Sequence, residues 1–588
     1  MLELKTELER LLADALISLV GSVLPRAVDP AWINVERARD ASHGDYACNI
    51  ALRLAKTVGR PPREIALAIV AALPPSVSVA RAEVAGAGFI NFHLIGAAHG
   101  DVLRQVLERG EHYGESDAGR GEHVILEFVS ANPTGPLHVG HGRQAAYGAT
   151  LGSLLRATGH SVHREYYIND AGRQMDILTL STWLRYLQAG GAELPFPSNG
   201  YRGDYVYAIA AQLTQQYGQS LQRPAAQVVA DLPQDAPLGD KEQHVDALIA
   251  RMRSLLGAAG FEQVLELALA VMLADIREDL AAFGVEFDRW YSERELVRSG
   301  AIEHALAALE ARGALYRKDG ALWFRASQYG DDKDRVLVRA NGQPTYFVPD
   351  IAYHLQKRER GFARLIDVLG ADHHGYVARV RGALVAMGEP GDCLEACLIQ
   401  FVSLFRAGQK IAMGKREAQF VTLRQLREEV GNDACRLFYL MRSHDQQLDF
   451  DLELAKSRSN DNPVYYIQYA HARVASVMKQ LEARQLQYDA AMASDNLARL
   501  DSPHEQAVLR ELARYPEVVL QAATARAPHT LVHYLRELAN TFHTWYNAAT
   551  FIVDDAPLRN ARLALALGLR QVIRNGLALL GVSAPDSM

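Results

Sequence analysis

The feature that most constrains this 588-residue chain is a short run rich in Val, Ile, Leu and Phe, at 123–130, that passes through an Asn-Pro-Thr-Gly turn into a long helical pattern. The helical pattern covers 142–158 and ends at Gly159, and a second strand-like run follows at 160–170. A strand, a helix and a second strand in this order form a βαβ unit, which is the building block of a parallel sheet. The sequence therefore predicts an α/β fold around a parallel sheet.

Three regions of different character are predicted. Residues 1–115 combine a helical pattern with the Gly-rich strand signal VAGAGFINF, which is typical of a small α+β domain. Residues 116–456 hold the βαβ unit, a helical insertion near 175–290, and further strand-like runs, which are ALWFRA, RVLVRA, PTYFVPD, ARLIDVLGAD and CLIQFVSLF. In residues 457–588, apolar side chains recur at helical spacing and predict an α-helical bundle.

Composition excludes several other classes of protein. With 49% hydrophobic and 22% charged residues, the chain is an ordinary globular protein and not a disordered one. Four scattered cysteines do not make a disulfide framework, and Cys393 and Cys397 lack a second pair that would complete a zinc site. We find no signal peptide and no apolar run of about 18 residues, so we expect a cytoplasmic protein without a membrane span. The net charge of −7 does not by itself suggest a nucleic-acid partner.

The strongest chemical signal is the segment Pro136–His141, which reads PLHVGH and stands where the first strand turns into the helix. His138 and His141 lie on one face of the first helical turn, where free N–H groups and the positive helix end favour a polyphosphate. Both imidazoles can donate to phosphate oxygens as charge builds at an α-phosphate, and Gly140 leaves room for a flat adenine. The alternative interpretation is a pair of partly buried histidines that only cap the helix.

These residues carry a resemblance to a known family. EFVSANPTGPLHVGH resembles the HIGH signature of class I aminoacyl-tRNA synthetases, in the extended form of bacterial arginyl-tRNA synthetases. Further stretches agree in order, namely REYYINDAGRQM, TYFVPDIAYH, LGADHHGY, NDNPVYYIQYAHAR and LLGVSAP. The resemblance spans essentially the whole chain. It implies a Rossmann-like catalytic domain, a monomer, and an arginine–tRNA ligase that joins L-arginine to tRNA(Arg) with ATP, with Mg²⁺ arriving with the ATP. Pro136 then belongs to the ATP site with the two histidines and Gly140.

The second catalytic element of this family is a mobile loop of the form KMSKS, which corresponds here to Ala-Met-Gly-Lys-Arg at 412–416. Lys415 matches the second family lysine, which stabilises the departing pyrophosphate, and Met413 matches a nucleotide-binding position. The first lysine and the serine of the motif are replaced, so this copy is degenerate. Whether Lys410 and Arg416 compensate stays open, and a solvated surface lysine is the alternative for Lys415.

Recognition of arginine requires carboxylates, because a guanidinium is a planar, permanent cation with five donors. By the resemblance, Tyr346 and Asp350 hold the guanidinium, Glu127 supplies another carboxylate, and Asn132 binds the α-amino group. The alternative for Asp350 is a helix N-cap, since Asp is favoured there.

Asp372 and His373, in LGADHHGY, follow a predicted buried strand at the edge where α/β proteins bind ligands. We expect them to contact the amino acid and the ribose. No further His or carboxylate stands at metal spacing, so we predict no dedicated metal site in the protein.

In the predicted bundle, Tyr466, Tyr469 and Arg473 share one helical face, and flat aromatic rings with a guanidinium suit stacking on RNA bases. The alternative is a tyrosine stripe in the bundle core. By the resemblance, Tyr546 and Met588 match positions that touch the anticodon loop, so the bundle is expected to bind the anticodon.

The N-terminal domain is expected to bind the tRNA elbow, since Asn91 and Phe92 lie in the segment that relatives use against the D-loop. Two other functions were weighed. HxGH also serves adenylyl transfer to small cofactors in stand-alone nucleotidyltransferases, which lack the N-terminal module and the bundle. The degenerate loop would also fit a catalytically silent RNA-binding paralogue.

Overall fold

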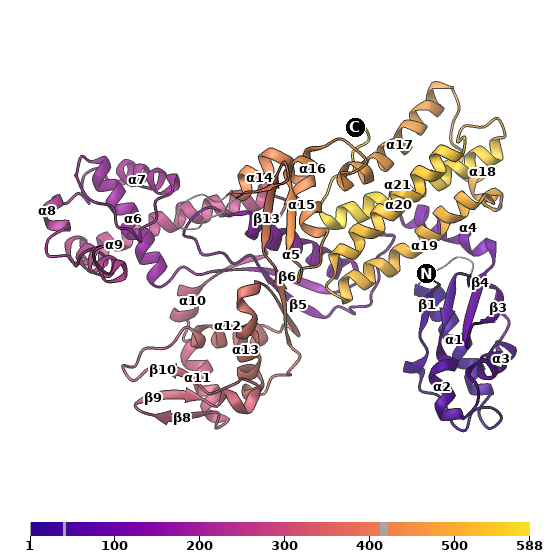
Figure 1. Cartoon of the computed structure of the whole chain (residues 1–588), viewed down its shortest axis with the longest axis horizontal. Coiled ribbons are helices and arrows are strands. Elements are labelled where there is room, and N and C mark those ends of the chain that lie inside the picture. Colours follow the sequence, from indigo (N-terminus) through magenta and orange to yellow (C-terminus); the bar gives the residue numbers. More distant parts are fainter. Residues whose placement is uncertain (1, 39–42, 412–420) are drawn as a thin grey trace.

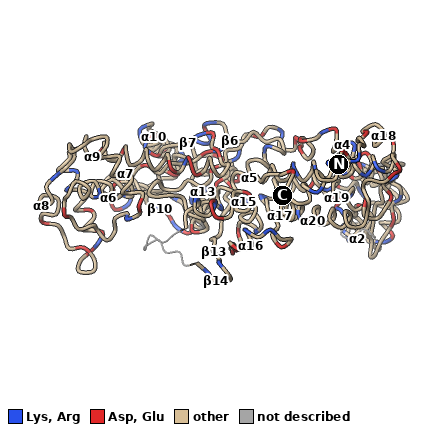
Figure 2. Tube along the Cα trace, turned by 90° about the horizontal axis from the view of Figure 1, so that it is seen from above, with Lys and Arg blue, Asp and Glu red and all other residues tan. Residues whose placement is uncertain are grey.

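The computed structural model describes residues 2–38, 43–411 and 421–588. The molecule is elongated, with an inserted helical lobe at one end and the N-terminal domain at the other (Figure 1). The central parallel sheet and the C-terminal helices lie between them. Charges of both signs are spread along the whole trace (Figure 2), so the net charge of −7 is not gathered in one region.

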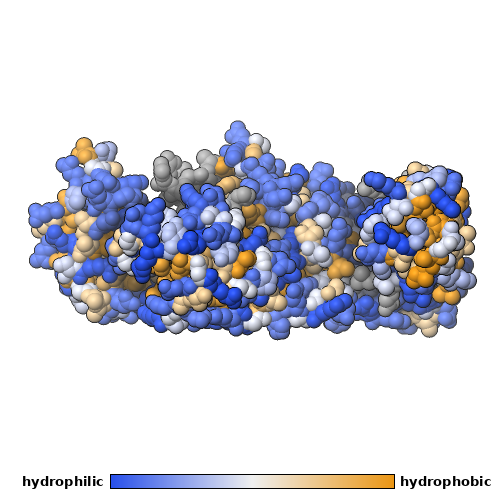
Figure 3. Space-filling view, turned by 90° about the horizontal axis from the view of Figure 1, so that it is seen from below, coloured by the Kyte–Doolittle hydropathy of each residue, from blue (hydrophilic) through white to orange (hydrophobic). Residues whose placement is uncertain are grey.

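The N-terminal domain is a four-stranded antiparallel sheet packed against helices, as predicted. Its strand order is β1-β2-β4-β3, with β1 (Val35–Arg37), β2 (Tyr46–Cys48), β3 (Val79–Ala85) and β4 (Phe89–Leu94). The apolar residues of α1 (Leu2–Ser18), α2 (Ile50–Val58) and α3 (Pro62–Ala72) form one core with the sheet. Seen from below, hydrophobic atoms gather on this domain (Figure 3).

A five-stranded sheet with the order β12-β11-β5-β6-β7 forms the centre of the molecule, and all its neighbouring strands are parallel. The strands are β5 (His123–Phe128), β6 (Ser161–Ile168), β7 (Arg289–Ser292), β11 (Arg364–Gly370) and β12 (Leu394–Ile399). Helix α5 (Val139–Ala157) connects β5 with β6, which confirms the predicted βαβ unit. The strand order reverses between β5 and β11, and parallel sheets bind ligands at the carboxyl ends of the strands at such a point.

The insertion between β6 and β7 is helical, as predicted. It holds α6 (Arg173–Ala189), α7 (Asp204–Tyr217), α8 (Ala225–Val228) and α9 (Lys241–Ala282). Helix α9 bends at Gly257, whose φ of 66° is accessible to glycine at little cost. A second excursion, between β7 and β11, contains the antiparallel sheet β10-β9-β8 and three α-helices. The strands are β8 (Leu315–Lys318), β9 (Ala321–Phe324) and β10 (Arg335–Val338), and the helices are α10 (Glu293–Arg298), α11 (Ala301–Ala311) and α12 (Phe347–Glu359). Helix α13 (His374–Met387) follows β11.

Two strand predictions are corrected. PTYFVPD is wrong as a strand, because Phe347 begins α12 and Pro349 lies in its first turn, where a missing N–H breaks no helical bond. CLIQFVSLF is two strands and not one, since β12 ends at Ile399 and β13 (Val402–Arg406) joins another sheet with β14 (Gln409–Lys410) and β15 (Leu448–Asp451). Short apolar runs do not by themselves distinguish these outcomes.

The C-terminal part is an α-helical bundle, as predicted. Helices α14 (Leu423–Val430), α15 (Asn432–Leu440) and α16 (Leu452–Lys456) lead into α17 (Pro463–Ala483), α18 (Ala490–Asp495), α19 (Pro503–Thr524), α20 (Pro528–Ala548) and α21 (Ala556–Leu580). Helix α4 (Gly96–Arg109) packs against α19 and α21, so the N-terminal segment and the bundle share a core. By length and composition α9 and α21 could each cross a membrane, but α21 is a core helix of the bundle.

Candidate active site

The turn after β5 is strained. Val129 and Ser130 have φ of 68° and 39°, a region that residues other than glycine rarely adopt and that is concentrated at functional sites. The Ser130 hydroxyl donates to Oε1 of Glu127 at 2.9 Å and accepts from the backbone N–H of Tyr167 at 3.1 Å. The strained turn thereby fixes Glu127 at the carboxyl end of the central strand.

The two histidines of the PLHVGH segment form a stacked pair at the start of α5. Their ring centroids lie 3.7 Å apart, with 18° between the planes. Nδ1 of His138 accepts from the Gly140 N–H at 3.1 Å, and Nδ1 of His141 accepts from the His138 N–H at 3.3 Å. A neutral ring whose Nδ1 accepts carries its proton on Nε2. The histidines therefore do cap the helix, and each also presents an Nε2–H donor.

The segment that follows residues 412–420 is bonded to this helix start. The Val139 N–H donates to the Val421 carbonyl at 3.3 Å, and the Leu423 N–H donates to the Leu137 carbonyl at 2.8 Å. Arg424, in α14, binds Asp275 and Asp279 of α9 at 2.8 and 2.7 Å. Residues 421–424, which follow the stretch that resembles KMSKS, are thus anchored beside the PLHVGH segment. The predicted residues Met413 and Lys415 of that stretch lie outside the described residues.

The carboxyl groups of Glu127, Asp350 and Glu293 form an acidic cluster at the same edge of the sheet. Burial, with Glu127 nearby, raises the pKa of Asp350 to about 6, although the Tyr376 hydroxyl lowers it. Burial, Asp350 and Asp170 raise the pKa of Glu293 to about 7. Carboxyl groups with pKa values raised in this way are short of positive charge, so the cluster is complementary to a cation.

Sequence reasoning missed Glu293. It directly follows β7, so its position after the strand RWYS at the carboxyl edge of the sheet was the signal that could have found it. The N-cap alternative for Asp350 is wrong, because Tyr346 occupies the N-cap of α12 and Asp350 lies in its first turn.

The remaining residues predicted to contact substrate lie at the surface of this edge. Asn132 is exposed and donates to Oε1 of Gln174 at 2.8 Å. Tyr346 is 78% exposed, so it covers no pocket in this structure. Asp372 and His373 are exposed after the end of β11, and Oδ2 of Asp372 lies 3.9 Å from Nε2 of His373. Pro136 is half-buried. In the described ranges, no three His, Cys, Asp or Glu side chains come together as metal ligands would.

Four residues predicted to bind RNA meet where α17 packs on α20. The Arg473 guanidinium lies over the ring of Tyr469 at 4.4 Å and over the ring of Tyr546 at 4.6 Å. His543 packs against the ring of Tyr466 at 4.6 Å and contacts Arg473 at 3.1 Å. We call these five residues the α17–α20 aromatic cluster. Its rings are partly buried, so the cluster belongs both to the bundle packing and to its surface.

The other predicted RNA contacts differ in exposure. Met588, at the chain end, is 51% exposed. Asn91 and Phe92 lie in β4 with only 3% and 1% of their surfaces exposed, because both side chains pack within the N-terminal domain. In this structure neither residue offers a surface to RNA, whereas Phe89 on the same strand is 43% exposed.

Comparison with known proteins decides the family. The chain matches the family models for the arginyl-tRNA synthetase N-terminal domain at 6–94, the class I (R) tRNA synthetase catalytic domain at 102–193, and the DALR anticodon binding domain at 467–588. An arginine–tRNA ligase of Thioalkalivibrio sulfidiphilus is 56% identical over 589 residues, with 100% of both chains covered. The chain belongs to the arginyl-tRNA synthetases. It is therefore an arginine–tRNA ligase with a class I catalytic domain.

Other members of this synthetase family agree. The arginine–tRNA ligase of Legionella pneumophila (strain Paris) is 52% identical over 590 residues, with 100% of both chains covered. The solved arginyl-tRNA synthetase of Thermus thermophilus has a TM-score of 0.74 at 25% identity and covers 100% of both chains. A putative arginyl-tRNA synthetase of Campylobacter jejuni has a TM-score of 0.72 at 30% identity, over 84% of this chain and 100% of that one.

Proposed function

We propose that the carboxyl edge of the central sheet binds ATP against the start of α5 and L-arginine against the acidic cluster. The arginine carboxylate attacks the α-phosphate in line, which forms arginyl-adenylate and releases pyrophosphate. The 2′-OH of the terminal adenosine of tRNA(Arg) then attacks the adenylate carbonyl, loses its proton to solvent, and releases AMP. The protein supplies position and charge stabilisation, without a covalent enzyme intermediate.

The stacked histidine pair supports the ATP site. Nε2–H donors from His138 and His141, together with the N–H groups of the first turn of α5, can stabilise the charge that develops on the α-phosphate. An added Cβ at Gly140 would lie 3.0 Å from the His138 ring, so the absence of a side chain there keeps the pair in place. In this proposal Pro136 and Met413 contact the adenine, His373 the ribose, and Lys415 the leaving pyrophosphate, with Mg²⁺ carried by the ATP.

The observation that carries arginine recognition is the crowding of carboxyl groups in the acidic cluster. Glu127, Asp350 and Glu293 come from three different elements, and the raised pKa values of Asp350 and Glu293 mean that a bound cation would relieve their repulsion. A guanidinium matches such a site because it can donate to several carboxylates at once. Tyr346 and Asp372 would complete the contacts to arginine, and Asn132 those to its α-amino group.

For tRNA, we propose that residues 1–115 bind the elbow and that residues 457–588 bind the anticodon, with 116–456 as the catalytic domain. The α17–α20 aromatic cluster supports the second assignment, because a guanidinium between two rings continues readily into a stack of RNA bases. We further propose that the enzyme is a cytoplasmic monomer.

ATP–pyrophosphate exchange tests the proposed reaction. We expect exchange that depends on L-arginine and tRNA(Arg) together, and transfer of labelled arginine to tRNA. Lysine and citrulline should not substitute for L-arginine in this exchange, since lysine lacks the planar guanidinium group and citrulline lacks its positive charge. Adenylyl transfer to a small cofactor without tRNA would favour a nucleotidyltransferase, and tRNA binding without exchange would favour a silent paralogue.

A further inference from the structure

Three acidic residues form a row across the middle of the central sheet. Glu127, on β5, is the direct register partner of Asp367 on β11 and of Glu165 on β6. All three side chains are almost completely buried. Like charges placed directly opposite each other in a sheet repel, and burial strengthens the repulsion, so the row requires nearby cations.

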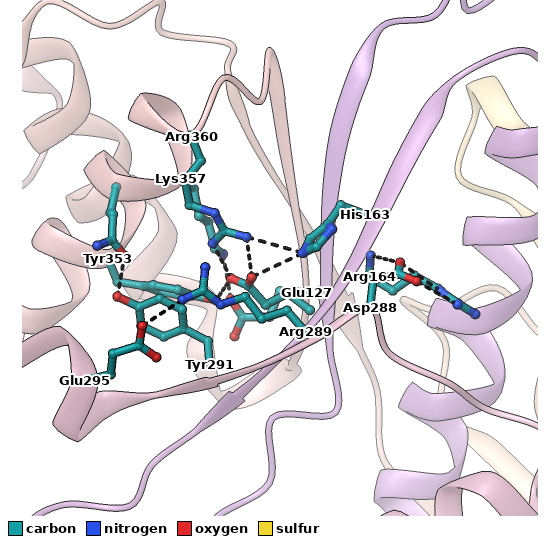
Figure 4. A network of polar contacts seen from close by, with 12 residues as sticks. Glu127, His163, Arg164, Asp288, Arg289, Tyr291, Glu295, Tyr353, Lys357 and Arg360 are labelled. Atoms are coloured by element: carbon teal, nitrogen blue, oxygen red, sulfur yellow. Dashed lines mark hydrogen bonds and ion pairs between the residues drawn. The ribbon is translucent and has the colours of Figure 1, made fainter.

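Helix α12 and its C-cap residue supply basic side chains from one face. His354, Lys357 and Arg360 follow one another at intervals of three residues, which places them on the same side of the helix. Figure 4 shows Lys357 and Arg360 pointing from this helix toward the sheet that carries Glu127. Arg360 binds Glu165 through two nitrogens, at 2.9 and 2.6 Å. Burial opposes ionisation of Glu165, yet His163, Arg360 and Lys357 lower its pKa to about 2.

Lys357 occupies the centre of this arrangement. Its side chain is 0% exposed, and Nζ donates to Oε2 of Glu127 at 2.6 Å and to Oδ1 of Asp367 at 2.9 Å. Burial would lower the pKa of Lys357, but Asp367 and Glu127 raise it above the ordinary value. Lys357 therefore stays charged, and its ammonium group lies between two adjacent carboxylates.

The row also connects to the opposite side of the acidic cluster. Oδ2 of Asp367 lies 2.7 Å from Nε2 of His354, and Nδ1 of the same ring lies 2.7 Å from the backbone carbonyl of Asp350. A continuous set of polar contacts thus runs from Glu127 through Lys357, Asp367 and His354 to the turn that carries Asp350. Lys357 itself is enclosed by protein and does not reach the surface of the site.

We propose that Lys357 is a positioning residue for arginine: it holds the Glu127 carboxylate in one orientation, and it sets that carboxylate relative to Asp350. The proposal rests on the proposed arginine site. Both oxygens of Glu127 are held, Oε2 by Lys357 and Oε1 by Ser130, and an ionised carboxylate can still accept further hydrogen bonds from a ligand. Without Lys357, the carboxyl groups of Glu127 and Asp367 would face each other in a buried site without the cation that now lies between them, and their repulsion would displace Glu127.

The experiment measures KM for arginine and for ATP, with kcat, in tRNA-dependent exchange by the full-length enzyme. Lys357→Met should raise KM for arginine at least about tenfold, because a bound cation then meets a displaced Glu127 carboxylate. KM for ATP should change less than about threefold. Arg358→Met is the matched control, since Arg358 is the next cation on α12 and binds Glu389 outside the row, at 2.7 Å.

A rescue variant separates positioning from a general structural role. Lys357→Met combined with Asp367→Asn removes the competing carboxylate, so Glu127 no longer faces a second negative charge and KM for arginine should recover by several-fold. Loss of packing alone would not be repaired in this way. Lys357→Arg, which keeps the charge and displaces its position, should fold and raise KM for arginine more than KM for ATP. If Lys357→Met fails to fold, this variant and the double variant carry the test.

Two outcomes overturn the inference. One is an unchanged KM for arginine in folded Lys357→Met or Lys357→Arg, and the other is an equal rise in the KM values for arginine and ATP without rescue by Asp367→Asn. The absence of arginine-dependent exchange in the parent enzyme would instead contradict the proposed function, so the two failures are distinguishable.

Discussion

The backbone N–H of Val139 donates to the carbonyl of Val421, and the two residues are far apart in the chain. This hydrogen bond, with its neighbour between Leu423 and Leu137, joins the start of α5 to the segment after residues 412–420. The PLHVGH segment and residues 421–423 are therefore connected through the backbone, independently of their side chains. Changes in the side chains of the PLHVGH segment should consequently leave the position of residues 421–423 largely intact.

Replacing His138 should separate its two roles. His138→Ala removes an N-cap acceptor, which costs about 1 kcal/mol of stability, and a donor to the α-phosphate, which costs about 10²–10³ in kcat for exchange. His138→Asn should keep the cap and most of the stability, because Asn is a favoured N-cap, while kcat stays reduced. Thermal unfolding and exchange kinetics check this. A variant with near-normal kcat and a collapsed Tm would assign His138 to capping alone.

The acidic cluster predicts a pH dependence with a definite sign. Because folding raises the pKa of Asp350 to about 6 and that of Glu293 to about 7, the folded, ligand-free enzyme binds more protons than the unfolded chain between about pH 4 and pH 7. These groups therefore contribute stability at low pH that is lost as pH rises through about 6 to 7. The free energy of unfolding should be measured across this pH range for the parent enzyme and for the variants Asp350→Asn and Glu293→Gln. Relative to the parent, both variants should be more stable at pH 8.

The ionisation of Asp350 and Glu293, which lowers the stability of the folded enzyme, should strengthen the binding of arginine. KM for arginine should fall as pH rises from about 5.5 to 7.5, since a cation binds best when both carboxyl groups are ionised. Asp350→Asn should raise KM for arginine more than tenfold at pH 7.5, in line with about 2–5 kcal/mol for a buried charge pair. KM for ATP should move far less. Equal losses for both substrates would show that Asp350 supports the site structurally.

The α17–α20 aromatic cluster should matter for tRNA and not for small substrates. Arg473→Ala removes the guanidinium between Tyr469 and Tyr546, and loss of base stacking costs about 1–3 kcal/mol, or roughly 5- to 150-fold in KM for tRNA. Aminoacylation at varied tRNA concentration and direct tRNA binding measure the effect. Tyr207→Ala, at a half-exposed aromatic residue of the insertion, is the control. Unchanged tRNA affinity in Arg473→Ala would assign the cluster to bundle packing.

An acid of the bundle binds side chains from two strands of the N-terminal domain. Glu517 on α19 accepts from Arg37 at 3.0 Å and from the Tyr46 hydroxyl at 2.7 Å. Glu517→Ala leaves both donors without this acceptor, at a cost of about 1.5–3 kcal/mol. Hydrogen exchange in β1 and β2 should then speed up, whereas Glu511→Ala, on the same helix and paired with Arg514, should leave it unchanged. Equal exchange in both variants would contradict this role of Glu517.

The sequence by itself determined the parts of this protein that depend on local patterns. A strand, turn and helix around Pro136–His141 were enough to predict the βαβ unit, because helix starts and strand ends carry short-range signals, and the same segment is the basis of the proposed nucleotide site. Helical spacing predicted the bundle in the same way. PTYFVPD was misjudged because a short aromatic and β-branched run fits a strand or the start of a helix, and packing decided for the helix.

Only the tertiary structure decided which distant residues meet. Glu293 joins Asp350 because β7 ends at the same edge of the sheet as β5, and no spacing in the sequence reports that. Asn91 is buried because its side chain packs within the N-terminal domain, although its motif suggested a surface contact. Glu127 faces Asp367 because two strands separated by more than two hundred residues are in register, and Lys357 sits between them because α12 crosses that row. Register and crossing are set by long-range packing, which local sequence does not encode.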